Sequence, residues 1–286
     1  MNKYGSSDKK DEKRKGGSKT KFVPRIVPVV PPEDTGNDGH PEIHPHLPQI
    51  AGPGGGALLL MISPVRTGKS TIISNLLLGD SDMGFYDAQE RFHTTTIISN
   101  TIANDVTSRF LAKAFDTHDS YNDSIIDGIV QQQKGYDKEE QPDIAVILDD
   151  CLGSIRREAR INHLASRFRH FNIKLLIISS QNFRSCSPII RQNATNVLVG
   201  SPFPNQKELG KMAEEYGDVF GGADNWLKIY QKATPDKYNF LHMDFQSNPP
   251  KAYRNFEELI AEGPKIIGDI PTLDEDLEFS DEEKKL

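Results

Sequence analysis

The chain has 286 residues, of which 36% are hydrophobic and 26% are charged, and its formal net charge at pH 7 is −7. The length allows one or two domains, and the composition is ordinary for a globular protein. The acidic balance argues against a protein that binds DNA over its whole surface, but it does not exclude a ring with a basic inner surface.

The cysteines and the hydropathy pattern indicate where the protein works. Cys151 and Cys186 offer neither a disulfide framework nor the spacing of zinc ligands. No apolar run approaches the roughly 20 residues that a membrane span requires, and the N-terminal residues are too polar for a signal peptide. We therefore expect an intracellular protein in a reducing environment, with no signal peptide.

The two ends of the chain differ in composition from its centre. The first 25 residues carry nine Lys or Arg against three Asp or Glu, and residues 24–53 contain eight of the 18 prolines. Residues 269–286 carry eight acids and two lysines. Residues 1–53 are predicted to be a disordered, basic and proline-rich arm that ends in an extended linker. Residues 54–266 are the predicted folded domain, and residues 267–286 are a predicted acidic, mobile tail.

Strand and helix patterns alternate through the folded domain. Strands are expected at residues 57–62, 93–101, 143–150, 173–181, 195–203 and 236–245, with helices from the first strand through Leu78, over 104–115 and over 205–217. The strands at 143–150 and 173–181 are apolar enough to be buried on both faces. This alternation predicts an α/β domain with a mainly parallel central β-sheet flanked by helices.

The segment SPVRTGKST (residues 63–71) matches the Walker A pattern of a P-loop, except that Ser63 stands where a glycine is usual. Backbone N–H groups of such a loop hold phosphates at the N-terminus of the next helix. Gly68 lets the chain turn beneath the phosphates, Lys69 supplies a cation to the β- and γ-phosphates, and Ser70 offers a hydroxyl to Mg²⁺. A chance Gly-Lys-Ser-Thr in a surface turn is disfavoured by the flanking strand and helix. The expected nucleotide-binding residues are Ser63, Pro64, Val65, Arg66, Thr67, Gly68, Lys69, Ser70 and Thr71, the last of them on the α-phosphate.

The strand DIAVILDD (residues 143–150) ends in two acids, which should lie beside the phosphate loop at the carboxyl edge of the sheet. We expect Asp149 to hold Mg²⁺ through water, as a Walker B aspartate does, and Asp150 to orient or deprotonate the attacking water. A strand that merely ends in solvated aspartates is the alternative.

Two other classes of P-loop protein are disfavoured. The string DCLG (residues 150–153) would suit a GTPase, but the Asn-Lys-x-Asp motif that reads guanine does not follow it. The arginine-rich segment after it would suit the lid of a nucleotide kinase, but the apolar strand that comes next could not be part of a lid.

The strand at 173–181 ends in Ser180-Gln181. A glutamine at the end of the strand beside the acidic one can contact both the γ-phosphate and the attacking water, and so report hydrolysis to the rest of the domain. An acid pair together with a sensing glutamine is typical of ring-forming motor ATPases.

The succession GKST, ILDD, RHFNIKLLIISSQ, PIIRQNAT and YNFLHMDFQSNPPKAYRNFEE, over roughly residues 56–260, resembles the genome-packaging ATPases of large double-stranded DNA viruses. These poxvirus-type enzymes are a branch of the FtsK–HerA P-loop NTPases, with an additional-strand (RecA/FtsK-like) sheet. The resemblance implies a hexameric or pentameric ring that threads duplex DNA into a preformed capsid. Many relatives carry Glu where Asp150 stands, and the shorter side chain requires a closer water or a shifted strand, which puts the turnover rate in question.

The resemblance also implies an arginine that reaches into the neighbouring subunit's site. Arg169 matches that position best, Arg167 is next, and Arg191 is a further candidate for a nucleotide or interface contact. A cluster of five arginines could grip DNA phosphates around a pore without reading sequence, or could form a solvated or subunit-pairing face. These residues are Arg156, Arg157, Arg160, Arg167 and Arg169.

The function predicted from the sequence is an ATP-hydrolysing translocase that packages viral double-stranded DNA, with ATP and Mg²⁺ as cofactors. Its expected partners are duplex DNA without sequence specificity, further copies of the chain in a ring, and a capsid or portal component, in the host cytoplasm, a virus factory or the virion. A plasmid or chromosome translocase of the FtsK–HerA type is one alternative. An ATP-binding assembly scaffold without turnover is another.

Overall fold

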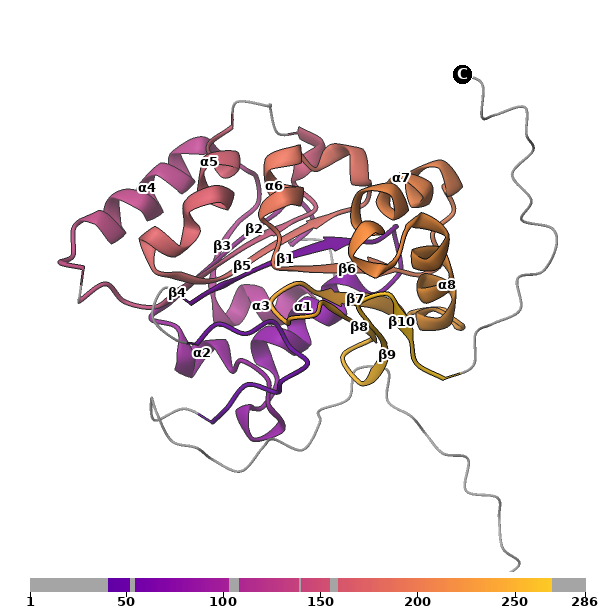
Figure 1. Cartoon of the computed structure of the whole chain (residues 1–286). Coiled ribbons are helices and arrows are strands. Elements are labelled where there is room, and N and C mark those ends of the chain that lie inside the picture. The colour runs from indigo at the N-terminus through magenta and orange to yellow at the C-terminus, as the bar shows by residue number, and fades with distance from the viewer. Residues whose placement is uncertain (1–40, 52–54, 103–107, 139, 155–158, 269–286) are drawn as a thin grey trace, which may run out of the picture.

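One ten-stranded β-sheet forms the centre of the described structure. A computed structural model of the chain describes residues 41–51, 55–102, 108–138, 140–154 and 159–268 (Figure 1). In these residues the strand order is β10-β9-β8-β7-β6-β1-β5-β4-β2-β3. The strands are β1 Ala57–Ile62, β2 Thr94–Ser99, β3 Asp116–His118, β4 Ile144–Asp149, β5 Ile173–Ser180, β6 Asn196–Gly200, β7 Phe240–Asp244, β8 Lys251–Arg254, β9 Glu258–Glu262 and β10 Lys265–Ile266.

Parallel and antiparallel strands divide the sheet into two parts. The strands from β6 to β3 pair in parallel, and β7 to β10 extend the sheet from β6 as an antiparallel meander. The predicted α/β fold with a mainly parallel central sheet flanked by helices is therefore confirmed. All six predicted strands are present, whereas β3, β8, β9 and β10 were not predicted.

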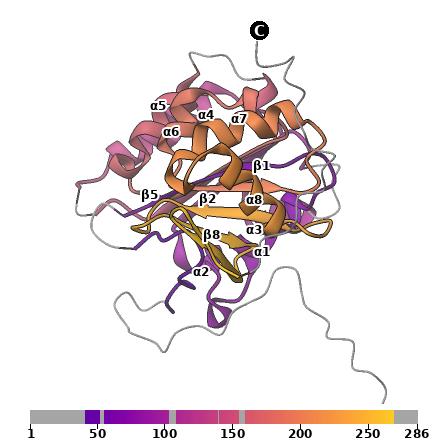
Figure 2. The same ribbon diagram turned by 45° about the vertical axis from the view of Figure 1, so that its right-hand side comes forward.

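Helices cover both faces of the sheet. The helices of the described residues are α1 Lys69–Leu78, α2 Ala88–Arg91, α3 Ser108–Ala114, α4 Asp123–Lys134, α5 Arg160–Arg167, α6 Pro188–Asn193, α7 Gln206–Tyr216 and α8 Ala223–Ala233. Helices α4 to α8 lie on one face, and α1 to α3 lie on the other (Figures 1 and 2). In the described part of the chain, no helix is both long and apolar enough to cross a membrane.

Strand β1 is buried along its whole length because both of its faces are covered. Leu58 and Leu60 belong to the hydrophobic core beneath α4 to α8, whereas Leu59 and Met61 belong to the core beneath α1 to α3. Successive side chains of a strand point to opposite faces, so a continuous apolar run is what a strand in this position requires. The strand fixes the start of the phosphate loop at the centre of the sheet, between β5 and β6.

Residues 41–51 do not form the expected uncompacted linker. Ile43, Leu47 and Ile50 are buried against the same core as α1, and the Tyr86 hydroxyl donates a hydrogen bond to the Pro48 carbonyl, at 2.7 Å. The prediction from proline content is wrong for this segment because apolar side chains stand between the prolines and have a core surface to cover. The rest of the predicted arm, residues 1–40 and 52–53, and the predicted tail from residue 269 onward lie outside the described residues.

Candidate nucleotide-binding site

The phosphate loop connects β1 to α1 and is closed by its own side chains. The Thr67 hydroxyl donates to the Pro64 carbonyl at 2.6 Å, and it also shares a short hydrogen bond with the Ser63 hydroxyl. Two residues have left-handed backbone conformations, Arg66 with φ 62° and Gly68 with φ 97°. The glycine begins α1, where a residue without a Cβ adopts this conformation at no steric cost. The chain therefore turns at Gly68, immediately before the first residue of α1.

Lys69 lies across the loop rather than in solvent. Its side chain is 9% exposed, and its Nζ donates to the Ser63 carbonyl at 2.8 Å. Burial lowers the pKa of Lys69, and the negative charges of Asp150 and Asp149 oppose that shift. The ammonium group is therefore already held between the loop and the two acids.

Asp149 ends β4 in a buried position between two serines. Its carboxylate accepts a hydrogen bond from Ser179 at 2.5 Å on one oxygen and from Ser99 at 3.2 Å on the other. Burial raises the pKa of Asp149, while the Ser179 hydrogen bond and the charge of Lys69 oppose the rise. The sequence did not single out either serine, although each lies near the end of a strand next to β4, and Ser99 is the register partner of Asp149.

Asp150 turns away from the strand toward the cavity. Its backbone has φ 57°, and its N–H donates to the Ser179 hydroxyl at 3.0 Å. Its carboxylate accepts a short hydrogen bond from the side-chain amide of Gln181, at the end of β5. Ser179 therefore contacts both aspartates, and the predicted sensing glutamine lies beside the predicted catalytic acid.

A cavity of about 540 Å³ brings the predicted residues together at the carboxyl edge of the sheet. Ser63 and Thr67 are buried beneath it. The predicted residues that line the cavity are Pro64, Val65, Arg66, Gly68, Lys69, Ser70, Thr71, Asp149, Asp150 and Gln181. Three further lining residues were not predicted, namely Thr101, Lys237 and Tyr238. Lys237 and Tyr238 precede β7, whose place beside β6 could not be inferred from the strand pattern alone.

The donor set at this cavity suits Mg²⁺. Among the described residues, no group of three or more His, Cys, Asp or Glu side chains could hold a metal by itself. Ser70 and Asp149 offer oxygen ligands at one cavity, and Mg²⁺ is commonly bound by one or two such groups together with waters and the phosphates of a substrate. Ser70 and Asp149 therefore fit the ion predicted for them, provided that a phosphate ligand completes its coordination.

The predicted inter-subunit arginines lie at the opposite edge of the sheet. Arg169 precedes β5, and its Nε donates to the carbonyl of Gly56, just before β1, at 3.2 Å. Arg167 and Arg169 border another cavity of about 540 Å³, together with Lys138 and His170. Because the strands are parallel, this amino edge faces away from the subunit's own phosphate loop. Neither arginine can serve that loop.

The remaining arginines of interest are distributed differently. Arg191 pairs with Glu215 at 2.6 Å and lies over the Phe183 ring, with 4.5 Å between its Cζ and the ring centroid. Arg160 pairs with Asp127 at 3.2 Å. Arg156 and Arg157 lie outside the described residues. Of the five clustered arginines, the structure describes three. Arg160 begins α5, whereas Arg167 and Arg169 lie at the amino edge of the sheet.

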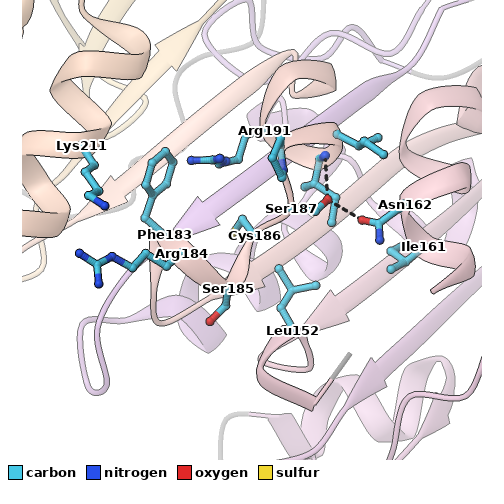
Figure 3. Close-up of a pocket in the computed structure, with 13 residues that line it drawn as sticks. Leu152, Ile161, Asn162, Phe183, Arg184, Ser185, Cys186, Ser187, Arg191 and Lys211 are labelled. Atoms are coloured by element: carbon cyan, nitrogen blue, oxygen red, sulfur yellow. Dashed lines mark hydrogen bonds between the residues drawn. The ribbon is translucent and has the colours of Figure 1, made fainter. Parts of the chain in front are cut away.

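A third cavity, of about 590 Å³, is lined by residues that follow Asp150 and Gln181 in the chain (Figure 3). Leu152 follows Asp150 by two residues, and Phe183 follows Gln181 by two residues. Arg184 and Lys211 lie at one end of the cavity, and Asn162, which accepts a hydrogen bond from Ser187, lies at the other. Short lengths of chain therefore connect Asp150 and Gln181 to residues that line this cavity.

Comparison with known proteins extends to the fold. No protein-family model and no curated protein sequence matches the chain. The structure is similar to that of the DNA-packaging ATPase from Sulfolobus turreted icosahedral virus, with a TM-score of 0.51 and 18% identity over 69% of this chain and 96% of that chain. This similarity shows that the two proteins share a fold, with the predicted mainly parallel sheet flanked by helices.

Two other solved structures align less well. The genome-packaging NTPase from Sulfolobus turreted icosahedral virus 2, in complex with AMP, aligns with a TM-score of 0.49 and 18% identity over 71% of this chain and 98% of that chain. EssC (ATPases 2 and 3) from Geobacillus thermodenitrificans aligns with a TM-score of 0.45 and 16% identity over 66% of this chain and 42% of that chain.

Proposed function

We propose that this protein is an ATPase that couples ATP hydrolysis to the movement of double-stranded DNA into viral capsids. One observation carries the proposal: Lys69, Asp149, Asp150 and Gln181 line a single cavity, and the Gln181 amide is hydrogen-bonded to Asp150. A binding site for phosphates needs only the loop, whereas hydrolysis also needs residues, such as an acid and a neighbouring glutamine, that position the attacking water. The fold shared with a viral DNA-packaging ATPase supports the same conclusion.

Different residues would bind the phosphates of ATP and the Mg²⁺ ion. The loop N–H groups and Lys69 would hold the phosphates, and Lys69 would exchange the Ser63 carbonyl for phosphate oxygens. Ser70 and Asp149 would hold Mg²⁺, the latter through water, and the ion would neutralise charge on the β- and γ-phosphates. Ser179 and Ser99 fix the Asp149 carboxylate, so its geometry is set before the nucleotide binds.

Asp150 and Gln181 would perform the step that follows binding. Asp150 would orient or deprotonate the attacking water, and its short side chain suits a water held close to the end of β4. Gln181 would leave Asp150 to contact the γ-phosphate and the water, and would return when phosphate is released. Because Phe183, which lines the third cavity, follows Gln181 by two residues, this exchange would move the segment that leads to α6.

A ring of subunits would complete the site. A head-to-tail contact brings the amino edge of one subunit to the carboxyl edge of the next, and such heterologous contacts close into rings when the rotation allows it. Arg169, with Arg167 beside it, would then reach the neighbour's nucleotide. We expect a hexamer or pentamer that grips duplex DNA through phosphate contacts without sequence specificity and that docks on a capsid or portal component.

The decisive experiment is ATPase activity with and without duplex DNA for the wild type, Lys69→Ala and Asp150→Asn. We expect DNA-stimulated turnover in the wild type and loss of turnover in both variants, with ATP binding retained by Asp150→Asn. Wild-type binding of ATP without turnover above the variants would favour an assembly scaffold. DNA-stimulated turnover by a protein that does not associate with capsid shells would favour a plasmid or chromosome translocase.

A further inference from the structure

The strand order at the carboxyl edge places an aromatic side chain on the other side of the phosphate loop from the acids. Strand β1 lies between β5 and β6, and β4 lies beyond β5. Strand β7 runs antiparallel to β6, with Phe240 opposite Gly200, so the segment that precedes β7 reaches the same edge. Along this edge the order is Asp149 and Asp150, Gln181, the phosphate loop, and then Lys237 and Tyr238.

Tyr238 is held in an unusual backbone conformation at this place. Its φ is 73°, in the left-handed region that tyrosine rarely adopts, yet its side chain is 39% exposed. The turn is fixed by Asp236 and Asn239: the Asn239 side chain accepts from the Asp236 N–H at 3.0 Å, and the Asn239 N–H donates to the Asp236 carbonyl at 3.2 Å. Such conformations persist where the surroundings impose them, and they concentrate at ligand sites.

The Tyr238 ring lies next to the start of the phosphate loop's helix. A Cβ on Gly68 would be 3.8 Å from Tyr238 Cδ1, and the two residues line the same cavity of about 540 Å³. The Lys237 Nζ lies 4.7 Å from the centroid of the Tyr238 ring, at the same end of the cavity. The Tyr238 ring therefore borders the phosphate loop on the side away from Asp149 and Asp150.

We propose that Tyr238 stacks on the nucleobase of the bound nucleotide. This inference rests on the proposed function. That proposal places the γ-phosphate of ATP near Asp150 and Gln181, and the inference places the base at the opposite end of the same cavity. A purine offers the ring the largest stacking surface, and stacking tolerates different bases because each has a π-face. The contact therefore contributes affinity for nucleotides in general and little discrimination between ATP and GTP.

The test compares a ligand that has a base with one that has none. Dissociation constants for ATP and for inorganic tripolyphosphate, each with Mg²⁺, are measured for the full chain by calorimetry. We expect Tyr238→Ala to weaken ATP binding by about 5- to 150-fold, the range that removal of one base–aromatic stack produces, and to leave tripolyphosphate binding unchanged. Tyr238→Phe should bind ATP as the wild type does.

A matched control is available in the same chain. Tyr136 is 38% exposed and lies outside this cavity, so Tyr136→Ala should change neither dissociation constant. Unchanged ATP binding in Tyr238→Ala overturns the inference, as does an equal loss of ATP and tripolyphosphate, which would make the ring a support for the loop. A wild type that binds neither ligand would instead refute the proposed function.

Discussion

The Cβ of Ser63 lies 2.8 Å from the position that a Cβ on Gly200 would occupy, and the Ser63 hydroxyl lies closer still. Ser63 begins the phosphate loop, and Gly200 ends the neighbouring strand β6. The serine therefore uses space that a side chain at position 200 would need. The departure from the usual first glycine of a P-loop is matched by a glycine on the adjacent strand.

Gly200→Ala should destabilise the protein by about 1–3 kcal/mol, the usual cost of overpacking a close-packed core. Adding Ser63→Gly removes the atoms that the new methyl group meets, so the double variant should regain most of that loss. Urea unfolding of the four proteins in the cycle gives the coupling energy. Gly210→Ala, in α7 with no atom within 4 Å of the new Cβ, should instead stabilise by about 0.5–1 kcal/mol. Independent effects at positions 63 and 200 would contradict the packing argument.

Gly68→Ala should disturb the loop through backbone strain rather than a clash. The nearest atom to the added Cβ is Tyr238 Cδ1 at 3.8 Å, an ordinary contact, but the φ of 97° is unfavourable for alanine by roughly 1–2 kcal/mol. We expect a loss of ATP affinity with a small change in unfolding midpoint. Gly128→Ala, in α4 with open space around the Cβ, is the control and should bind ATP normally.

Asp149→Asn should stabilise the nucleotide-free protein at neutral pH while abolishing its response to Mg²⁺ and ATP. Burial raises the pKa of Asp149, so the folded chain binds this proton more tightly than the unfolded chain does, and ionisation costs stability as pH rises through the raised value. The advantage of the asparagine should therefore be present at pH 7, should shrink as pH falls through the raised pKa, and should be absent below the ordinary carboxyl pKa. Thermal unfolding across that pH range, with and without Mg²⁺ and ATP, measures both effects.

A mixture of Lys69→Ala and Arg169→Ala subunits should regain ATPase activity that neither variant has alone. Lys69 and Arg169 lie at opposite edges of the sheet, so a Lys69→Ala subunit can lend its Arg169 to the intact loop of an Arg169→Ala neighbour. Mixing each variant with itself is the control. If no ratio of the two restores turnover, Arg169 does not act across the subunit contact, and Arg167→Ala becomes the variant to test.

Removal of residues 1–51 should destabilise the domain much more than removal of residues 1–40. Ile43, Leu47 and Ile50 are at most 8% exposed, and burial of such a side chain contributes about 1.5–3 kcal/mol. Chemical denaturation of the two truncated chains measures the difference. Equal stability of the two would mean that residues 41–51 contribute nothing to the core.

The central half of the sheet was predictable because its strands carry uninterrupted apolar runs. Strands β1, β4 and β5 are buried on both faces, so composition alone marks them, and their shared carboxyl edge follows from parallel pairing. The position of Lys69 near Asp149, Asp150 and Gln181 was inferred on that basis. The antiparallel strands β8 to β10 are short and carry polar residues such as Lys251 and Glu258, so no period-2 pattern of useful length identified them.

Contacts that depend on tertiary register were not predictable. Ser99 and Ser179 donate hydrogen bonds to the Asp149 carboxylate only because the pairing registers of β2, β4 and β5 bring their ends together. Lys237 and Tyr238 reach the cavity because β7 adds to β6 in the antiparallel sense, a choice that the strand pattern leaves open. The burial of residues 41–51 likewise depends on a surface that other segments create.

Because Lys69 and Arg169 lie at opposite edges of the sheet, the two edges of each subunit carry different functional groups. In the proposed ring, each subunit would receive an arginine at one edge of the sheet and offer one at the other, so a dilute monomer would lack a complete catalytic centre. Turnover should then rise more steeply than linearly with protein concentration until assembly is complete. In a closed ring, the nucleotide state of each subunit would affect one particular neighbour, so that ATP hydrolysis would proceed around the ring in one direction.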